Sequence, residues 1–147
     1  MNLNQIIKAV GYAVIGSYGQ VAVADAIPYT DNVKVNLGQS VYAQNCASCH
    51  GRNLEGQFNW QKRSADGYLP APPHDETGHT WHHPDQMLFE FTKYGPQKFA
   101  GADYKSKMPA YDGTLTDEEI WNVLAYIKSK WPNKIQRKHT EAYGSIQ

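Results

Sequence analysis

The feature that most restricts this sequence is the segment Cys46-Ala47-Ser48-Cys49-His50, which contains both cysteines of the chain. Residues at positions i, i+3 and i+4 of a helix share one face, so a helical turn here points Cys46, Cys49 and His50 in the same direction. Two thiols and an imidazole together form a compact set of donors. The fold must therefore leave space on that side for whatever the three side chains bind.

The spacing C-x-x-C-H is the attachment signal for c-type haem. The two thiols form thioethers with the haem vinyl groups, and the imidazole that follows them reaches the iron. Covalent attachment also stabilises a small domain, much as a disulfide or a structural metal does. We therefore predict one haem c, bound covalently through Cys46 and Cys49, with His50 as an iron ligand.

Two other uses of a cysteine pair, in a zinc site and in a redox pair, fit this sequence less well than haem attachment. A zinc site could combine them with His79 and His83. The 29 residues between Cys49 and His79 are too many for a zinc finger, and such a site leaves His50 without a role. A thioredoxin-like redox pair needs a strand–helix–strand context, which the sequence lacks.

The iron of an electron-carrying haem usually has a second protein ligand, and Met108 is the residue we predict. It lies in an irregular segment, Lys107-Met108-Pro109-Ala110, where a loop stiffened by Pro109 can lie over the far haem face. Met87 instead falls on the apolar stripe of an expected helix, with Leu88 and Phe91, and we interpret it as core filler.

The histidine cluster His79, His82 and His83 is the main rival source of a second ligand. One of these residues could give bis-histidine ligation, the cluster could bind a second metal, or the rings could form hydrogen bonds within their own loop. We prefer the last interpretation. His74 and His139 show no signal beyond their polarity.

Hydrophobic periodicity predicts three main helices separated by long irregular stretches. The first is expected at about 38–47 and the second at about 84–93, with irregular stretches over 51–83 and 95–115. A loop as long as 51–83 needs a reason to be ordered, and a large flat cofactor supplies one.

The third helix has the clearest sequence signals. Thr116 at the N-cap and Glu119 three residues later form a capping box. Apolar residues then recur at helical spacing and Pro132 ends the helix; they are Ile120, Val123, Leu124, Ile127 and Trp131. We predict that the polar tail, residues 133–147, is loosely held.

Residues 1–24 are interpreted as a signal peptide. Lys8 precedes a run of small and apolar residues, and Ala22-Val23-Ala24 offers a cleavage site. The run is too short and too often interrupted to cross a bilayer comfortably. An uncleaved anchor or a disordered tail is the alternative. We therefore expect an exported protein, periplasmic or otherwise extracytoplasmic, with its main domain over residues 25–132.

The charge balance argues against two classes of partner. The chain has 14 basic and 14 acidic residues, which gives no nucleic-acid footprint and no polybasic membrane signal. Redox proteins, including a membrane or periplasmic oxidoreductase, are the partners that an electron-carrying haem implies.

Over residues 34–132 the chain resembles a class I monohaem cytochrome c of the small bacterial type. Gly38 and Tyr42 precede the haem motif at the spacing of that family's first helix. The segment Met108-Pro109-Ala110 resembles its methionine loop, and residues 115–120 and 124–127 resemble the start and packing core of its last helix.

The resemblance implies an all-α cytochrome c fold, with three main helices and long loops around one covalent haem. The first and last helices should cross at Gly38, with Tyr42 and Tyr126 in contact nearby. A carbonyl near Pro70 or Pro72 should accept a hydrogen bond from the His50 ring.

The longer and more Trp- and His-rich stretch 59–83 departs from the best-known members of the family. Trp60, Arg63 and Trp81 within it either donate hydrogen bonds to the haem propionates or pack as ordinary side chains.

The function implied is electron transfer by iron cycling between Fe(III) and Fe(II), without enzymatic chemistry. Two alternatives stay open. The chain could be the electron-transfer subunit of a periplasmic oxidoreductase, or a haem-based gas sensor or peroxidase with a displaceable iron ligand.

Overall fold

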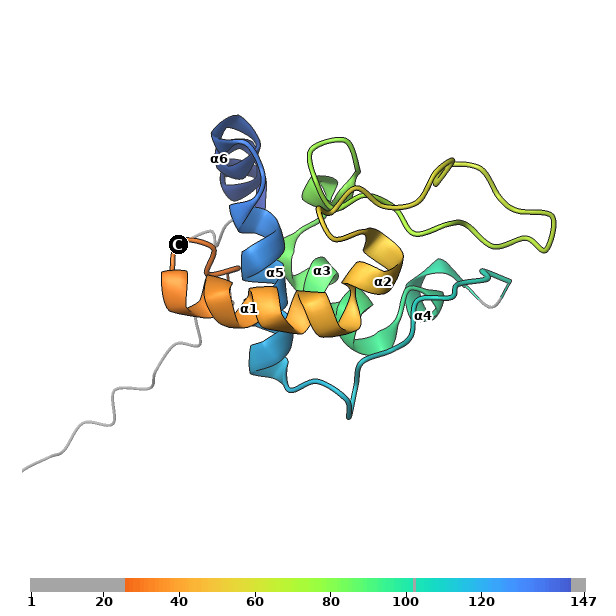
Figure 1. Cartoon of the computed structure of the whole chain (residues 1–147), viewed down its shortest axis with the longest axis horizontal. Helices are drawn as coiled ribbons and strands as arrows, with labels where there is room; N and C mark the ends of the chain where they lie inside the picture. Colours follow the sequence, from red (N-terminus) through yellow and green to blue (C-terminus); the bar gives the residue numbers. More distant parts are fainter. Residues whose placement is uncertain (1–25, 102, 144–147) are drawn as a thin grey trace, which may run out of the picture.

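The computed structural model describes residues 26–101 and 103–143, so the signal peptide and cleavage site predicted at the N-terminus lie outside the described residues. The described chain is helical, and no strand forms in it beyond an isolated bridge between Asp112 and Leu115. The all-α prediction is confirmed. The elements are α1 (Asn32–Asn45), α2 (Ala47–His50), the 3-10 turn η1 (Thr80–His82), α3 (Asp85–Tyr94), α4 (Gln97–Ala100), α5 (Asp117–Ser129) and α6 (Asn133–Tyr143) (Figure 1).

Helix α1 begins at Asn32, earlier than the expected start near Gly38. Asp31 is its N-cap, and the Asp31 carboxylate accepts hydrogen bonds from the amides of Val33 (2.9 Å) and Lys34 (3.3 Å). The helix ends at Asn45, and the chain turns at Cys46 into the short helix α2. The haem motif therefore lies at a corner between two helices.

Helices α1 and α5 cross in close contact, as Figure 1 shows. A Cβ atom at Gly38 would overlap the Asn122 carbonyl group and lie 3.0 Å from the Val123 nitrogen. The rings of Tyr42 and Tyr126 contact each other beside the crossing, with centroids 5.3 Å apart. The predicted packing glycine and its aromatic neighbours are confirmed.

Replacing Gly38 with valine should destabilise the haem-loaded protein by about 1–3 kcal/mol, because the new side chain meets α5 backbone that cannot move aside cheaply. Its unfolding midpoint should fall while the haem spectrum stays the same. Ser40→Val is the matched control, since Ser40 is exposed on the same helix. Equal midpoints for the two variants would show that the crossing tolerates a side chain at Gly38.

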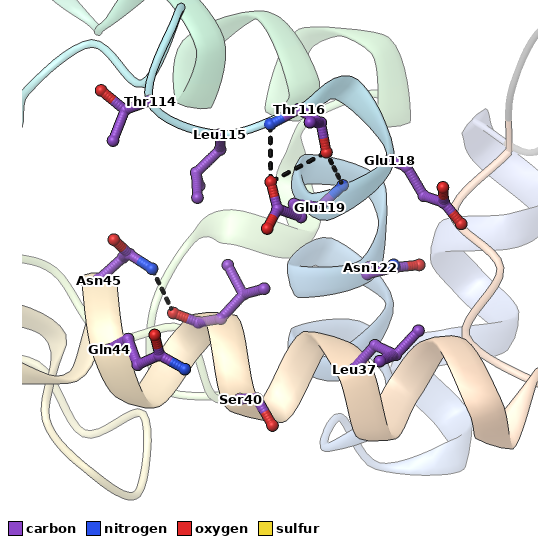
Figure 2. A pocket seen from close by; sticks show the side chains of 11 residues that line it. Leu37, Ser40, Gln44, Asn45, Thr114, Leu115, Thr116, Glu118, Glu119 and Asn122 are labelled. Atoms are coloured by element: carbon purple, nitrogen blue, oxygen red, sulfur yellow. Dashed lines mark hydrogen bonds between the residues drawn. The ribbon is translucent and has the colours of Figure 1, made fainter.

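The start of α5 has the predicted capping box, drawn in Figure 2. The Thr116 hydroxyl accepts from the Glu119 amide (3.2 Å), and the Glu119 carboxylate accepts from the Thr116 amide (2.8 Å). The apolar residues predicted for this helix form much of the core: Ile120, Val123, Leu124, Ile127 and, just beyond the helix, Trp131.

Helix α3 buries only part of the predicted stripe, because Leu88 is buried and Phe91 is half-buried but Met87 is exposed. Met87 is 37% exposed, whereas Leu88, Phe89 and Thr92 are buried. Asp85 is buried too, because its carboxylate accepts a hydrogen bond from the Ile27 amide (3.0 Å) and lies 3.7 Å from the Lys128 ammonium group. The interpretation of Met87 as core filler is therefore wrong. Apolar periodicity misled it because two polar residues share the buried face.

The prediction of a loosely held tail is also wrong for residues 133–143, which form α6. His139 is 1% exposed and its Nδ1 lies 3.5 Å from the Asp85 carboxylate. The Tyr143 hydroxyl donates to the His82 carbonyl (2.9 Å). Polar contacts, together with Ile135 packed against the core, hold this helix in place. Its sequence therefore shows too few apolar residues for periodicity to detect it. No helix within the described ranges is both long enough and apolar enough to cross a membrane.

Candidate functional site

The haem motif forms one helical turn at the α1–α2 corner. The amides of Cys49 and His50 both donate to the Cys46 carbonyl, at 3.1 and 2.9 Å. This turn places the two cysteines and His50 at the predicted i, i+3, i+4 positions of a helix. The two cysteines do not form a disulfide with each other; Cys46 is partly buried and Cys49 is exposed. Burial, reinforced by Cys49, raises the pKa of Cys46 to about 11.

The His50 ring is fixed by a hydrogen bond to the Pro72 carbonyl, with Nδ1 2.8 Å from the oxygen. A carbonyl can only accept, so Nδ1 carries the proton and Nε2 keeps a free lone pair. Burial lowers the pKa of His50, which favours the neutral imidazole. A neutral ring with one free nitrogen is the form of histidine that binds metals, and the expected partner near Pro70 or Pro72 is confirmed at Pro72.

His74 covers one side of the His50 ring. The two rings are stacked, with centroids 4.0 Å apart and planes 25° apart. Burial, together with the neighbouring His50 and His79, lowers the pKa of His74 well below its usual range, so this ring is neutral as well. Sequence reasoning missed His74. Its only signal was its position, two residues after the carbonyl that holds His50.

The Met108 loop is tied to the same corner of the molecule. Tyr111 donates from its hydroxyl to the Asn45 carbonyl (2.7 Å), immediately before Cys46. Burial, with added effects of Cys46 and Cys49, raises the pKa of Tyr111 to about 12. Met108 is partly buried, and its amide donates to the Ser106 hydroxyl (3.0 Å). Ligation by Met108 stays a prediction.

The clustered histidines pack against aromatic neighbours. His79 stacks on Trp60 at 5.4 Å and contacts His83 edge-on, and His82 lies 3.7 Å from Trp81 between ring centroids. In residues 26–101 and 103–143, no group of three or more His, Cys, Asp or Glu side chains is arranged to hold a metal ion. The cluster needed for the zinc alternative or for a second metal is thus not found in those ranges.

The proposed propionate donors have partners within the chain. The Arg63 guanidinium donates to the Gly67 carbonyl (2.7 Å) and lies 5.5 Å from the Tyr104 ring centre. The Trp81 indole donates to the Glu76 carbonyl (3.4 Å). These contacts favour the packing interpretation of Arg63 and Trp81 over propionate binding.

A second feature near the haem motif is a surface groove between α1 and the start of α5 (Figure 2). Leu37, Val41 and Leu115 contribute its apolar side chains, and Glu118 and Glu119 lie along it. Its lining contains no cysteine, histidine or methionine, so it does not supply the donor set described above.

Comparison with known proteins decides the family. The family model for cytochrome c matches residues 35–131, well over half of the chain. This chain belongs to the cytochrome c family. Covalent haem c is the cofactor of this family, and its members transfer electrons through that haem, so both predictions are confirmed at that level.

Individual relatives differ in length: one is matched over almost its whole length, and two are much longer than the matched region. The chain is 31% identical to cytochrome c6 of Diacronema lutheri, over 63% of this chain and 92% of that protein. It is 26% identical to the FixP subunit of a cbb3-type cytochrome c oxidase of Sinorhizobium medicae (strain WSM419), over 71% of this chain and 32% of that protein. It is 29% identical to a thiosulfate dehydrogenase of Stutzerimonas stutzeri (strain A1501), over 63% of this chain and 26% of that protein. No solved structure matches the chain.

Proposed function

We propose that this cytochrome carries single electrons between extracytoplasmic redox proteins, with haem bound by Cys46 and Cys49 and with His50 and Met108 as iron ligands. The observation that carries the proposal is the 2.8 Å contact between His50 Nδ1 and the Pro72 carbonyl, which leaves Nε2 free to bind iron. When bound, the haem supplies a one-electron Fe(III)/Fe(II) couple.

The donor set fits that cofactor. Two cysteines outside any disulfide and a neutral imidazole, all on one helical turn, match two thioethers and one iron–nitrogen bond. The Pro72 carbonyl orients the His50 ring and strengthens its donation to a metal. Tyr111 holds the end of the Met108 loop beside Cys46, and two protein ligands leave no position for a substrate. Methionine paired with histidine favours the reduced state relative to two histidines.

Potentiometric titration of the purified protein tests this proposal. We expect one reversible one-electron transition and no binding of carbon monoxide by the native ferrous protein, because both iron positions are filled by side chains. Tight carbon monoxide binding would instead favour the sensor or peroxidase alternative.

A role as an oxidoreductase subunit is the second candidate. It is favoured by the two longer relatives, in which the matched region covers 32% and 26% of the protein. Helix α6, beyond the matched residues, adds a surface that such a partner could contact. Isolation of the native protein in a stable complex would support this candidate over a free carrier.

Electron exchange should occur near the Met108 loop, where several lysine ammonium groups lie over aromatic rings. The Lys105 and Lys107 ammonium groups lie 5.8 and 4.9 Å from the Tyr68 ring centre. The Lys98 ammonium lies 3.6 Å from the Tyr94 ring centre. Lys93 differs, because its charge is paired with Asp117 at 2.6 Å. Lys107 lies 3.8 Å from the Asp66 carboxylate, so its charge is partly balanced. The unpaired charge of this surface therefore comes mainly from Lys98 and Lys105, which suits an acidic partner.

Reversing the charge of Lys105 and Lys107 to glutamate should slow oxidation by anionic ferricyanide about tenfold at low ionic strength and flatten its salt dependence. Oxidation by a cationic cobalt(III) complex should become faster, and the haem spectrum should stay the same. Lys134→Glu with Arg137→Glu on α6 is the matched control. If the control pair has the larger effect, electrons leave near α6 instead.

A further inference from the structure

His74 has the contacts of a residue that is itself held in place. Its amide donates to the Leu54 carbonyl (2.8 Å), and its carbonyl accepts from the Trp131 indole (2.8 Å). Its Nδ1 lies 2.8 Å from the Thr80 hydroxyl. The backbone and the ring of His74 are therefore both fixed, and the ring lies against His50.

The two contacts on His50 restrain different motions. A hydrogen bond to the Pro72 carbonyl sets where Nδ1 points, but a single hydrogen bond still lets the ring tilt about its Cβ–Cγ bond. A second flat ring at a 4.0 Å centroid distance, with planes 25° apart, opposes this rotation. It also keeps water from that side of the ring, where water would compete for the Pro72 carbonyl.

Residues 131–143, which follow α5, support this arrangement through hydrogen bonds. Trp131 follows α5 and is 2% exposed, and its indole reaches the His74 carbonyl. Further along, Nε2 of His139 lies 2.9 Å from the His83 carbonyl, and the Tyr143 hydroxyl donates to the His82 carbonyl (2.9 Å). The segment from His74 to His83 is thus fastened at both ends by residues that follow α5.

We propose that His74 is a positioning residue that sets the plane of the His50 ring, and that Trp131 holds His74 in this position. The inference rests on the proposed function, in which His50 is an iron ligand. The proposal gives a role to His74, for which sequence patterns indicate none. It also gives Trp131 a role beyond packing in the hydrophobic core.

The test compares His74→Ala with His74→Phe in the haem-loaded protein. The haem methyl proton shifts of the ferric protein depend on the plane of the axial imidazole, so they report its orientation directly. His74→Ala should change the pattern of these shifts and lower the reduction potential, because water reaching the ring stabilises the more highly charged ferric form. His74→Phe keeps a flat ring in place and should stay close to the native pattern.

Trp131→Phe tests the support without touching either ring, since it removes the indole donor and keeps an aromatic side chain. It should shift the methyl pattern in the same direction as His74→Ala, but less. Trp121→Phe is the matched control, because the Trp121 ring stacks on Phe89 at 4.7 Å and it is Trp131 that donates to His74, so this change should cause no shift. If His74→Ala cannot be purified with haem bound, the comparison of methyl shifts between Trp131→Phe and Trp121→Phe tests the proposal instead.

Native methyl shifts and potential in His74→Ala, or equal shifts in the two tryptophan variants, would overturn the proposal. Failure of the proposed function would look different. Denaturing mass spectrometry would then show no covalent haem on the unmodified protein, or its ferric spectrum would lack an imidazole ligand.

Discussion

Replacing Cys46 and Cys49 together with alanine should abolish covalent haem and leave a chain that does not fold stably. No thiol then remains to form a thioether, and binding through the iron alone, by His50 and Met108, is reversible. Denaturing mass spectrometry of the exported protein measures the effect: the native chain should be heavier by one haem, and the variant should not. Ser48→Ala is the matched control, because Ser48 lies between the two cysteines and should leave attachment complete.

The loss of order should be greatest in residues 51–83. This segment contributes Leu54 to the buried hydrophobic core and Trp81 at its edge, while most of its other side chains are exposed or half-buried. So little apolar burial does not offset the entropy of ordering a loop of this length. Limited proteolysis of the double variant should therefore cut first within 51–83. Haem that extracts from the native protein into acidified organic solvent would contradict covalent attachment.

Local sequence signals were sufficient to predict the parts of this fold that depend on neighbouring residues. Thr116 and Glu119 predicted the start of α5, and the apolar spacing from Ile120 predicted its buried face. The contact of His50 with Pro72 followed from the family resemblance, because the two are 22 positions apart in the sequence and no periodicity links them.

The errors have a common physical cause, which is burial of polar side chains. Asp85 is buried together with Lys128 and His139, at 3.7 and 3.5 Å from them. Apolar periodicity cannot detect such a cluster, so the polar part of the buried face of α3 and the existence of α6 were both missed. His74 was missed for a similar reason. Its role depends on stacking against the His50 ring, and its position in the sequence does not reveal that contact.

Replacing Met108 with alanine should convert a protein with two iron ligands from the chain into one with a single ligand, His50. The ferric protein should then lose completely the weak near-infrared absorption associated with methionine ligation. It should also bind added imidazole or cyanide readily, and the ferrous form should bind carbon monoxide. Optical titration with each ligand measures the change, because the native protein must first release Met108 and should bind them far more weakly.

Met87→Ala is the control for this experiment. Met87 is 37% exposed on α3, so its removal should cost little stability and leave the near-infrared band unchanged. Met108→His should keep both iron positions filled, exclude added ligands and lower the reduction potential, because two histidines favour the ferric state relative to histidine and methionine. An intact near-infrared band in Met108→Ala would assign the methionine signal elsewhere, and Met87 would be tested next. A native protein that lacks this band from the outset would point to His79, His82 or His83, each of which an alanine substitution would then test in turn.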